Sequence, residues 1–522
     1  MSKSILAQYT IRSKQDYIFR TNRIVEIMGA SANISKAWKV LFEEAENCGI
    51  VRQSENTEFR LADTEKQFEQ KEVQMVELFC GGGNETVLFD SIETYREVNQ
   101  AFSYRIMKDH PGMIPMSEYC EVSGDYKEDY KNLMTRTEAR KNVMAPGRNE
   151  FILPFSMMDR DTFQPYTDVI KIEGNEKRIT AEGLAKRTVG ISVRDNDTSV
   201  KLLDDMVTKK EEEGLLAVVH ADGNNMGRKI MDMLGEETSY DVCVKKMREF
   251  TKETKRAFVD EGLKALHNCR EDLERKYSEK HLKDTAFAFR EVIADGDDMT
   301  FICNARFVME YVKAYLEAVY RYQSRHQSEW SYSSCAGICI FHSHYPFARA
   351  YSLAEQCCDD GAKTMVHKTD INGNAKAEVV EECWVDYHYI HSGIGGNLMA
   401  IRHNRGTEDR MARPWRVCGQ GSLPRDYNQL EKLAVILKEH KVARSNVKEI
   451  GSAWEYSKED GYKELARVCA HAENREDERL EDRLRALFPK GEELDRGKLL
   501  KALYDLSEIY DLWFREVKEC LT

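Results

Sequence analysis

Between residues 215 and 303, apolar runs alternate with polar and Gly-rich stretches. LLAVV (215–219) is a continuous apolar run that predicts a buried strand, and HADGNNMG after it predicts a turn. Farther on, MREFTKETKRAFVDEGLKALHNCREDLERKY predicts a long amphipathic helix. FAFREVIADGDDMTFIC has apolar runs on both sides of an Asp/Gly cluster, so it predicts a strand, a turn and a second strand.

The same rhythm continues to about residue 380. ARFVMEYVKAYLEAVYRYQSR has apolar residues at three- and four-residue spacing and predicts a second helix. SSCAGICIFHSHYPFARAYSLAEQCCDDGAK predicts a strand followed by a third helix. The resulting order, β-α-β-β-α-β-α, is that of a ferredoxin-like split βαβ frame with an antiparallel hairpin at its centre. The sequence therefore predicts an α+β fold.

The regions on either side differ from this central one. Residues 1–205 mix strand-like and helical patterns, and the polar stretch 135–150 predicts a loop. Residues 192–214 end in a run of charged residues, which predicts a linker or a connecting helix. From about residue 425 the chain is helical and highly charged, which is typical of a solvated helical bundle. We predict three domains, with bounds 1–205, 206–380 and 381–522.

Composition excludes several classes of protein. A formal charge of −13 argues against a blanket nucleic-acid coat, although a local basic groove is compatible with it. The N-terminus has no apolar signal-peptide core, and no run of 18 apolar residues exists, so we expect a cytoplasmic protein without a membrane span. The 14 cysteines form no CxxC pair, which argues against a zinc site and for free thiols.

Acidic residues gather at the predicted turn of the hairpin, in REVIADGDDMTFIC. Asp295, Asp297 and Asp298 occupy three of four positions, and Asp222 follows the strand 215–219. In a split βαβ frame the first strand and the central hairpin are neighbours, so these carboxylates can converge. Carboxylates that share one place repel each other unless cations lie between them, and Mg²⁺ is usually held by one or two carboxylates plus phosphates. An ordinary Asp/Gly hairpin turn is the alternative.

Several segments together resemble a known family. VVHADGNNMG, VIADGDDMTFI, SCAGICIFHSHYPFARAYSLAEQCCDDGAK and VDYHYI are similar to the second palm domain of the large polymerase-like subunit of type III CRISPR effector complexes, which is related to GGDEF cyclases. DYIFRTNRIVEIMGASANIS and LFCGGGNETVLF are similar to the first palm of that family, in which a Gly-rich hairpin replaces the acidic one. The resemblance implies two ferredoxin-like palm domains, of which only the second is catalytic, followed by a C-terminal helical bundle.

The resemblance also implies site residues. Asp222 and Asp297 would be the metal ligands, with Asp298 assisting, and all three carboxylates would take part in catalysis. Nucleotide binding would involve both palms, through Gly223, Asn225, Gly296 and Lys363 in the second palm and through Gly82, Gly83 and Asn84 in the first. Lys363 is also compatible with a solvated lysine at a helix end, and the glycines with a plain hairpin. The first palm has no carboxylate at its turn, so it would bind a second nucleotide as acceptor.

The implied reaction is polymerisation and ring closure of ATP into a cyclic oligoadenylate second messenger in antiviral defence. It would use two Mg²⁺ or Mn²⁺ ions. The implied partners are the subunits of a guide-RNA complex and target RNA, or a second copy of the chain if the protein acts alone. Two alternatives remain open: a stand-alone cyclic dinucleotide synthase, and a catalytically inert palm scaffold of an RNA-guided complex.

Three departures from the family pattern stand out. Asp295 occupies the position where the family hairpin has its first Gly, as a harmless turn variant or as a third acid near the metals. No HD dipeptide occurs in the chain, so no DNase activity is expected, and no cysteine pairs lie between the palms. His342 and His344 could share one face of a strand end, but a strand end before a Pro-containing turn explains them more simply.

Overall fold

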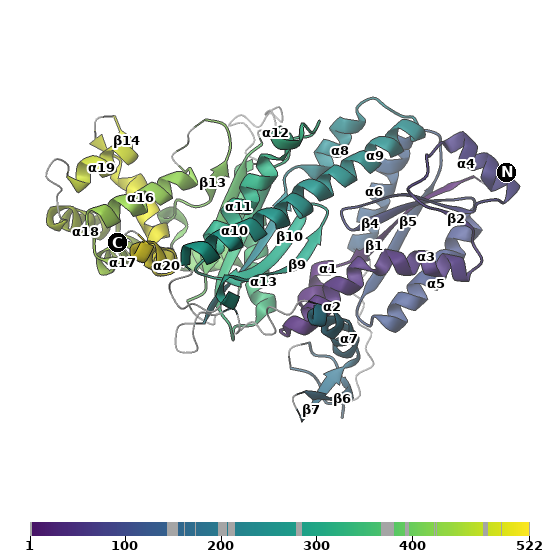
Figure 1. Ribbon diagram of the computed structural model, residues 1–522, viewed down its shortest axis with the longest axis horizontal. Coiled ribbons are helices and arrows are strands. Elements are labelled where there is room, and N and C mark those ends of the chain that lie inside the picture. Colours follow the sequence, from purple (N-terminus) through teal and green to yellow (C-terminus); the bar gives the residue numbers. More distant parts are fainter. Residues whose placement is uncertain are drawn as a thin grey trace. The chain divides into compact units, whose positions relative to one another are not determined.

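The computed structural model gives an α+β protein with two mixed sheets (Figure 1). It describes the chain except for residues 1–2, 144–154, 161, 173, 197–205, 207–213, 278–283, 367–380, 392–395, 422, 424, 473–478, 492 and 521–522. The chain divides into two compact units. The first unit comprises residues 1–201, 225–259 and 292–297, and the second comprises 202–224, 260–291 and 298–522.

The first sheet has five strands in the order β2-β3-β4-β1-β5. Their bounds are β1 (Ile5–Arg12), β2 (Arg52–Gln53), β3 (Met75–Gly81), β4 (Asn84–Phe89) and β5 (Ile114–Glu121). β1 pairs antiparallel with β4 and β5, and β3 pairs antiparallel with the central strand β4. The β3–β4 turn consists of Gly82 and Gly83, whose φ values are 57° and 64°. Two consecutive positive φ values are those of a type I′ hairpin turn, which favours glycine.

Helices cover both faces of the first sheet, as Figure 1 shows. The helices are α3 (Ala37–Asn47), α4 (Leu61–Gln70), α5 (Ile92–Asp109), α6 (Tyr126–Val143), α8 (Met226–Leu234) and α9 (Tyr240–Lys255). Tyr9 of β1 packs edge-on against Phe102 of α5, and the preceding residue, Gln8, donates to Met134 of α6. Because consecutive strand residues point to opposite faces, α5 and α6 lie on opposite sides of the sheet.

A second layer of the first unit is formed by α1 (Lys14–Phe19), α2 (Ile24–Ser35), β6 (Tyr166–Ile172), β7 (Asn175–Thr180) and α7 (Ala181–Asn196). Helices α2 and α7 touch backbone to backbone: a Cβ at Gly29 would lie 1.8 Å from the Lys186 carbonyl oxygen. The buried Lys186 ammonium donates to Glu182 at 2.6 Å, and burial lowers the pKa of Lys186 to about 8.

The second sheet has six strands in the order β13-β12-β11-β8-β10-β9. Their bounds are β8 (Leu215–Gly223), β9 (Phe289–Asp295), β10 (Asp298–Asn304), β11 (Ser334–His342), β12 (Cys383–Tyr389) and β13 (Trp415–Cys418). β8 pairs antiparallel with β10 and β11, whereas β12 is parallel to β11. The order β9-β10-β8-β11 repeats the order β3-β4-β1-β5 of the first sheet.

The three helices that the sequence predicts after these strands are present, some of them divided into shorter pieces, and the turn η4 is additional. The elements are the π-helical turn η2 (Arg256–Asp260), α10 (Glu261–Tyr277), the 3₁₀ turn η4 (Asp284–Phe287), α11 (Val308–Tyr320), α12 (Tyr322–His326), α13 (Phe347–Gln356), the π-helical turn η5 (Cys357–Ala362) and α14 (Lys363–Val366). Phe301 of β10 packs on Tyr311 of α11, and His220 of β8 packs on Tyr351 of α13. Phe301 pairs with Val219, the neighbour of His220, so α11 and α13 lie on opposite faces of the second sheet.

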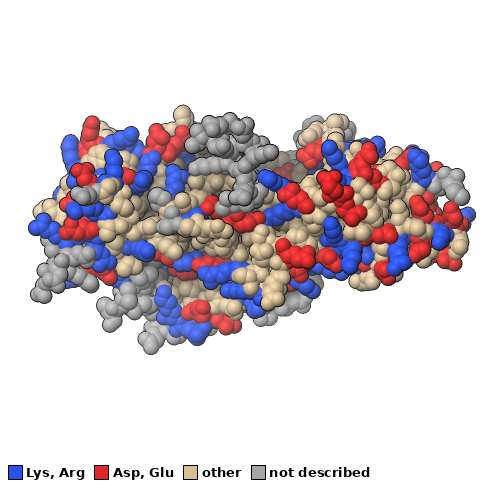
Figure 2. All heavy atoms as spheres, turned by 90° about the horizontal axis from the view of Figure 1, so that it is seen from above, with Lys and Arg blue, Asp and Glu red and all other residues tan. Residues whose placement is uncertain are grey.

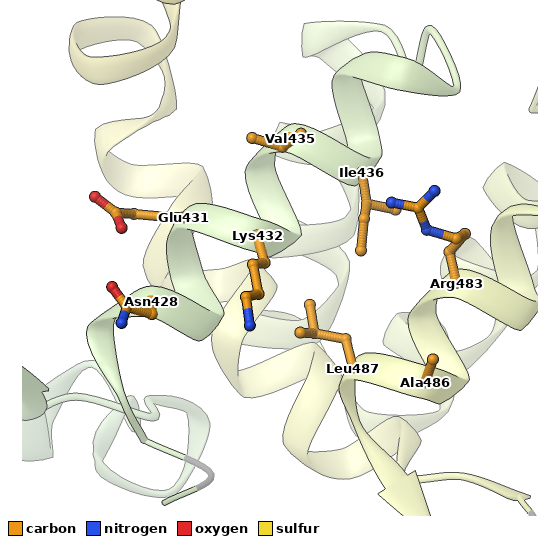
Figure 3. A pocket seen from close by; sticks show the side chains of 8 residues that line it. All are labelled: Asn428, Glu431, Lys432, Val435, Ile436, Arg483, Ala486 and Leu487. Atoms are coloured by element: carbon orange, nitrogen blue, oxygen red, sulfur yellow. The ribbon is translucent and has the colours of Figure 1, made fainter. Parts of the chain in front are cut away.

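The C-terminal part is mostly helical, as predicted. It contains α15 (Leu398–Asn404), the 3₁₀ turn η6 (Glu408–Arg410), α16 (Tyr427–Glu439), α17 (Arg444–Tyr456), α18 (Lys458–His471), α19 (Leu480–Leu487), β14 (Pro489–Lys490), β15 (Glu493–Leu494) and α20 (Arg496–Cys520). Figure 3 shows a cavity of about 500 Å³ between α16 and α19, with Val435, Ile436 and Leu487 among its lining.

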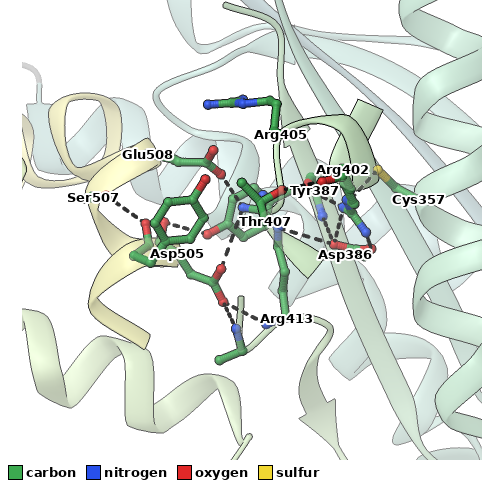
Figure 4. A network of polar contacts seen from close by, with 12 residues as sticks. Cys357, Asp386, Tyr387, Arg402, Arg405, Thr407, Arg413, Asp505, Ser507 and Glu508 are labelled. Atoms are coloured by element: carbon green, nitrogen blue, oxygen red, sulfur yellow. Dashed lines mark hydrogen bonds and ion pairs between the residues drawn. The ribbon is translucent and has the colours of Figure 1, made fainter. Parts of the chain in front are cut away.

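A buried polar network ties α20 to the second sheet (Figure 4). Arg402 bonds both carboxylate oxygens of Asp386, at 2.7 and 2.9 Å. Arg413 forms an ion pair with Glu508 of α20 and lies 3.8 Å from Asp505. Asp505 accepts hydrogen bonds from the backbone N–H groups of residues 412 and 413, and burial raises its pKa to about 7. The C-terminal helix is therefore packed on the sheet through charges as well as apolar side chains.

The predicted loop at 135–150 is wrong over its first half, because α6 continues to Val143. The segment is polar overall, but Leu133 and Thr137 follow Tyr126 and Asp129 at helical spacing and are buried, which is enough to hold the helix. The domain bounds at 205 and 380 lie outside the described residues and stay predictions, and β12 and β13 continue the second sheet beyond 380.

Surface charge and thiols agree with the composition. On the face drawn in Figure 2, acidic and basic side chains are interspersed. The cysteines that the structure describes are free thiols. Among the described residues, none of the helices combines the length and the apolar character that crossing a membrane requires.

Candidate active site

Two carboxylates lie at neighbouring strand ends in the second unit. Asp222 is the last residue but one of β8, and Asp298 is the first residue of β10. The ladder between these strands pairs Ala221 with Met299, so Asp222 and Asp298 are the next residues along, at its end. Both side chains are about one quarter exposed, at 28% and 27%. The antiparallel register thus brings together two acids that are 76 residues apart in the sequence.

Lys363 is the cation of this site. Its ammonium forms an ion pair with Asp222 and a second one, at 2.9 Å, with Asp359. Burial lowers the pKa of Lys363, but the two carboxylates outweigh burial and raise that pKa above its ordinary value. Lys363 is therefore charged throughout the physiological pH range, next to a carboxylate that the sequence predicts to hold metal.

The π-helical turn η5 places Lys363. A Cβ at Gly337 of β11 would lie 1.9 Å from the Ala354 carbonyl oxygen, and a Cβ at Gly361 would lie 2.1 Å from Asp386. These two glycines let the helix backbone lie directly on β11 and β12, where larger residues would lift it away. A π-bulge inside a helix is often found at functional sites.

His220 lies on β8, two residues before Asp222. It is 3% exposed, and its Nδ1 lies 3.3 Å from Thr300 Oγ1 and 3.4 Å from Asp298 Oδ1. Burial lowers the pKa of His220, although Asp222 acts in the opposite direction. The histidine is thus a neutral, packed strand residue that contacts one of the two acids.

A polar cluster fixes the end of β8. Ser334 Oγ donates to the Asp222 carbonyl oxygen at 3.0 Å. The buried Asn224 side chain donates to Ser333 Oγ at 3.0 Å and to the Glu382 carbonyl oxygen at 2.9 Å. Gly223 pairs with Ser334 in the β8–β11 ladder. These bonds hold the backbone on both sides of Asp222, so its carboxylate starts from a rigid position.

The first unit contains a separate pocket of about 420 Å³ next to the glycine turn. Its apolar wall is formed by Phe79, Tyr130, Met134, Met226, Ile230, Met247 and Phe250. Its polar lining includes Gln8, Asn84, Thr251, Lys252, Lys255, Asp295 and Asp297. Such a pocket, with apolar walls and polar groups at its rim, suits a flat heterocycle that carries a charged tail.

The tip of the acidic hairpin belongs to the same unit and touches the glycine turn. A Cβ at Gly296 would lie 3.1 Å from the Cα of Gly82, and Gly296 has a φ of 62°. Close approach and positive φ therefore both require glycine at position 296.

The donor set fits hard divalent cations. Mg²⁺ is usually held by one or two carboxylates together with substrate phosphates, and Asp222 and Asp298 supply two carboxylates at one sheet end. In the part of the chain that the structure describes, no group of three or more His, Cys, Asp or Glu residues is arranged to hold a metal ion.

The structure thus brings Asp222, Asp298 and Lys363 together in the second unit, and Gly82, Asn84, Gly296 and Asp297 around one region of the first unit. Asn225 begins α8 with a left-handed φ of 57°. The two histidines singled out in the sequence lie at a strand end. His342 is the last residue of β11, and His344 lies in the following turn, where its backbone N–H donates to His342 Nδ1.

Sequence reasoning missed two residues near these groups. Asp359 precedes Lys363 by four residues, which is a readable helical ion-pair spacing. Lys14 donates to the carbonyl oxygens of Gly83 and Gly82. Nothing in its local sequence signals this role, because only the fold brings position 14 to the turn.

Comparison with known proteins identifies the central region. Residues 215–372 match the family model described as Cas10/Cmr2, second palm domain. No curated protein matches the chain significantly.

Solved structures also resemble the chain. A chain of a Csm1–Csm4 cassette in complex with cA4 has 11% identity and a TM-score of 0.43, over 84% of this chain and 62% of that one. A cassette in complex with one ATP has 11% identity and a TM-score of 0.49, over 97% and 69%. Csm1 in T. onnurineus has 13% identity and a TM-score of 0.45, over 96% and 70%. At these TM-scores the likenesses carry no argument about fold or function.

Proposed function

Because residues 215–372 carry the second palm domain of the Cas10/Cmr2 family, we propose that this protein polymerises and cyclises ATP into a cyclic oligoadenylate-type messenger. That family provides the polymerase-like subunit of type III CRISPR effector complexes. The observation that carries the proposal is the carboxylate pair Asp222 and Asp298 at the facing ends of β8 and β10. A protein that kept this domain only as a scaffold would have no use for two neighbouring acids that repel each other.

The two sheets are proposed to be two palms of ferredoxin-like form. The support is topological: β3-β4-β1-β5 and β9-β10-β8-β11 have the same order, with a tight hairpin at the same place. In the proposed division of work the second palm is catalytic, and the first palm, whose turn is Gly82-Gly83-Asn84, binds a nucleotide without chemistry.

The three carboxylates Asp222, Asp297 and Asp298 would hold two Mg²⁺ or Mn²⁺ ions. Bound there, the ions would supply activation of an attacking 3′-hydroxyl and charge neutralisation on the α-phosphate and the leaving pyrophosphate. The protein's own residues orient the nucleotide: Gly223 and Asn225 leave room for the phosphates to approach the backbone, and Lys363 binds the triphosphate. Lys363 can leave Asp222 for a phosphate at little cost, since both partners are anionic oxygen groups.

The pocket of the first unit is proposed to take the base and ribose of a second nucleotide. Met134, Met226 and Met247 give it polarizable walls that suit a purine, and Gln8 and Asn84 offer amide groups to the edge of a base. Lys252 and Lys255 at the rim suit a phosphate tail.

As partners we propose the other subunits of a guide-RNA complex and target RNA, which would switch synthesis on.

The test is an incubation of the purified protein with Mg²⁺ or Mn²⁺ and each labelled NTP, with products identified by mass spectrometry. Asp298→Asn is the inactive variant, and Asp482→Asn, the same change on the exposed surface of α19, is its matched control. A cyclic adenylate formed by wild type and by the Asp482 variant, but not by the Asp298 variant, supports the proposal.

Two other outcomes decide between the alternatives. A cyclic dinucleotide as the sole product points to a stand-alone dinucleotide synthase. If the isolated chain forms no product, the assay is repeated with the native complex and target RNA. No product under those conditions contradicts the proposed synthase and supports an inert scaffold.

A further inference from the structure

We propose that Lys14 and Asp295 form a positioning pair that fixes the glycine turn Gly82-Gly83, and that Asp295 is not a metal ligand. The inference rests on the proposed function, because the turn it fixes borders the proposed nucleotide pocket. It assigns a role to Lys14, and it decides what the third acid of the hairpin does. All four residues belong to the first unit.

Lys14 reaches the turn from the end of β1. The strand ends at Arg12, and Ser13, with a left-handed φ of 49°, reverses the chain so that Lys14 begins α1. The ammonium then donates to the Gly83 carbonyl oxygen and, at 3.4 Å, to that of Gly82. A turn of two glycines has no side chains to stiffen it, so these two bonds supply a constraint that the turn lacks by itself.

Asp295 approaches the same point. A Cβ at Gly83 would lie 2.0 Å from Lys14 Nζ and 2.8 Å from Asp295 Oδ2, so the cation and the anion share a small volume beside Gly83. The two carbonyl oxygens carry only partial charge, and the carboxylate completes the compensation of the ammonium. Glycine is required at 83 for this reason, in addition to its φ of 64°.

The two tips are also in backbone contact at the neighbouring residues. The space that a Cβ of Gly296 would need is limited by the Cα and N of Gly82, at 3.1 and 3.3 Å. The two charged side chains beside Gly83 and this backbone contact act on adjacent residues of the same two turns. Loss of either charge would therefore loosen the rim of the pocket that includes Gly82, Asn84 and Asp295.

A metal role for Asp295 has no support in the same geometry. Its carboxylate oxygen Oδ2 instead lies beside Gly83 and Lys14.

The experiment compares Lys14→Met, Asp295→Asn and the double variant with wild type. Lys3→Met is the matched control. Lys3 precedes β1 at the end opposite to Lys14 and makes an exposed ion pair with Glu121. The first readout is amide hydrogen exchange of the segment 78–89, which contains the turn. Each single variant is expected to speed exchange about twofold to fivefold, and the double variant no more than the larger single one. Additive effects, or no effect in either single variant, overturn the pair.

The second readout is the affinity for Mn²⁺ alone, measured by titration. Asp295→Asn is expected to change it less than twofold, whereas Asp298→Asn lowers it about tenfold or more. A tenfold loss in the Asp295 variant would make Asp295 a ligand and overturn the inference. If Asp298→Asn also leaves Mn²⁺ binding unchanged, the proposed function fails, while the exchange experiment still decides the pair.

Discussion

The two sheets place different chemistry on the same frame. In the first sheet the ladder between β1 and β4 ends with Thr10 opposite Asn84. At the corresponding end of the β8–β10 ladder in the second sheet stand Asp222 and Asp298. Two residues inward, Gln8 opposite Thr86 corresponds to His220 opposite Thr300. The strand order is the same, so two side chains at the ladder end decide whether a sheet can hold cations.

The turns differ in a matching way. Both loops have two residues, Gly82-Gly83 and Gly296-Asp297, and both begin with a glycine at positive φ. Gly83 also has positive φ, whereas Asp297 does not, so the second loop can carry a side chain that the first cannot. The acidic turn is thus a tight hairpin in which glycine is present only where the backbone needs it.

The largest expected effect comes from removing one acid of the pair. Asp298→Asn should lower the rate of cyclic product formation about a thousandfold, because the site then lacks a carboxylate that it needs to bind the divalent cations. Asn84→Ala, the equivalent change in the first sheet, should cost less than about tenfold. Product formation is measured by mass spectrometry under the conditions in which the wild type is active. Equal losses in both variants would break the comparison.

The next effect concerns the cation beside Asp222. Lys363→Met should raise the KM for ATP about 10- to 100-fold, the size expected for a lost charge-assisted hydrogen bond. The change in kcat should be smaller, because Lys363 is proposed to bind the triphosphate and not to transfer protons. Initial rates over a range of ATP concentrations separate the two. A Lys363 variant with an unchanged KM would limit its role to the ion pair with Asp222 and Asp359.

His388 of the second unit should make a contribution to folding stability that is lost in acid. Burial, together with Arg413, lowers the pKa of His388 on β12 to about 4. A histidine with a lowered pKa in the folded state stabilises the fold above its ordinary pKa of about 6.5, and this contribution is lost as pH falls toward 4. Between pH 7 and 5 the loss should be roughly 2 kcal/mol. In urea unfolding, His388→Phe should show a smaller pH dependence than wild type, and an equal dependence would contradict the assignment.

The smallest effect should come from adding an acid to the first sheet. Asn84→Asp restores one carboxylate, but its partner position is Thr10, so no pair forms. We expect a change of less than about threefold in both product formation and Mn²⁺ affinity. A gain of a second tight Mn²⁺ site would show that one carboxylate is enough and that the register argument fails.

The sequence was informative where the signal is local. Asp222 and Asp298 stand directly after a buried strand and at a DGDD turn, so their chemistry can be predicted before any fold is known. The strand and helix order of 215–366 follows from apolar periodicity alone, and the structure has it in that order. The roles of Asp222, Asp297, Asp298 and Lys363 in metal and nucleotide binding stay predictions.

The rest depends on contacts that no local pattern contains. Thr10 lies opposite Asn84 only because of the β1–β4 register. Lys14 reaches the glycine turn only because the chain reverses at Ser13. The π-helical turn η5 exists because Gly337 lets the helix lie on β11, and neither residue signals the other in the sequence. Helix α6 was missed because a narrow apolar stripe in a polar segment is weak evidence for a helix.

The network around Arg413 determines how this chain can be divided for expression. A fragment that ends before α16 would keep Arg413 and Asp386 but lose Asp505 and Glu508 of α20. A buried guanidinium deprived of its partners costs about 3–5 kcal/mol, a large part of the stability of a domain. Tyr387 and Trp415 would also lose the hydrogen bonds that they donate to residue 505. The smallest fragment that folds around Asp222 therefore includes α20, and a shorter one should yield insoluble protein, whatever its catalytic residues.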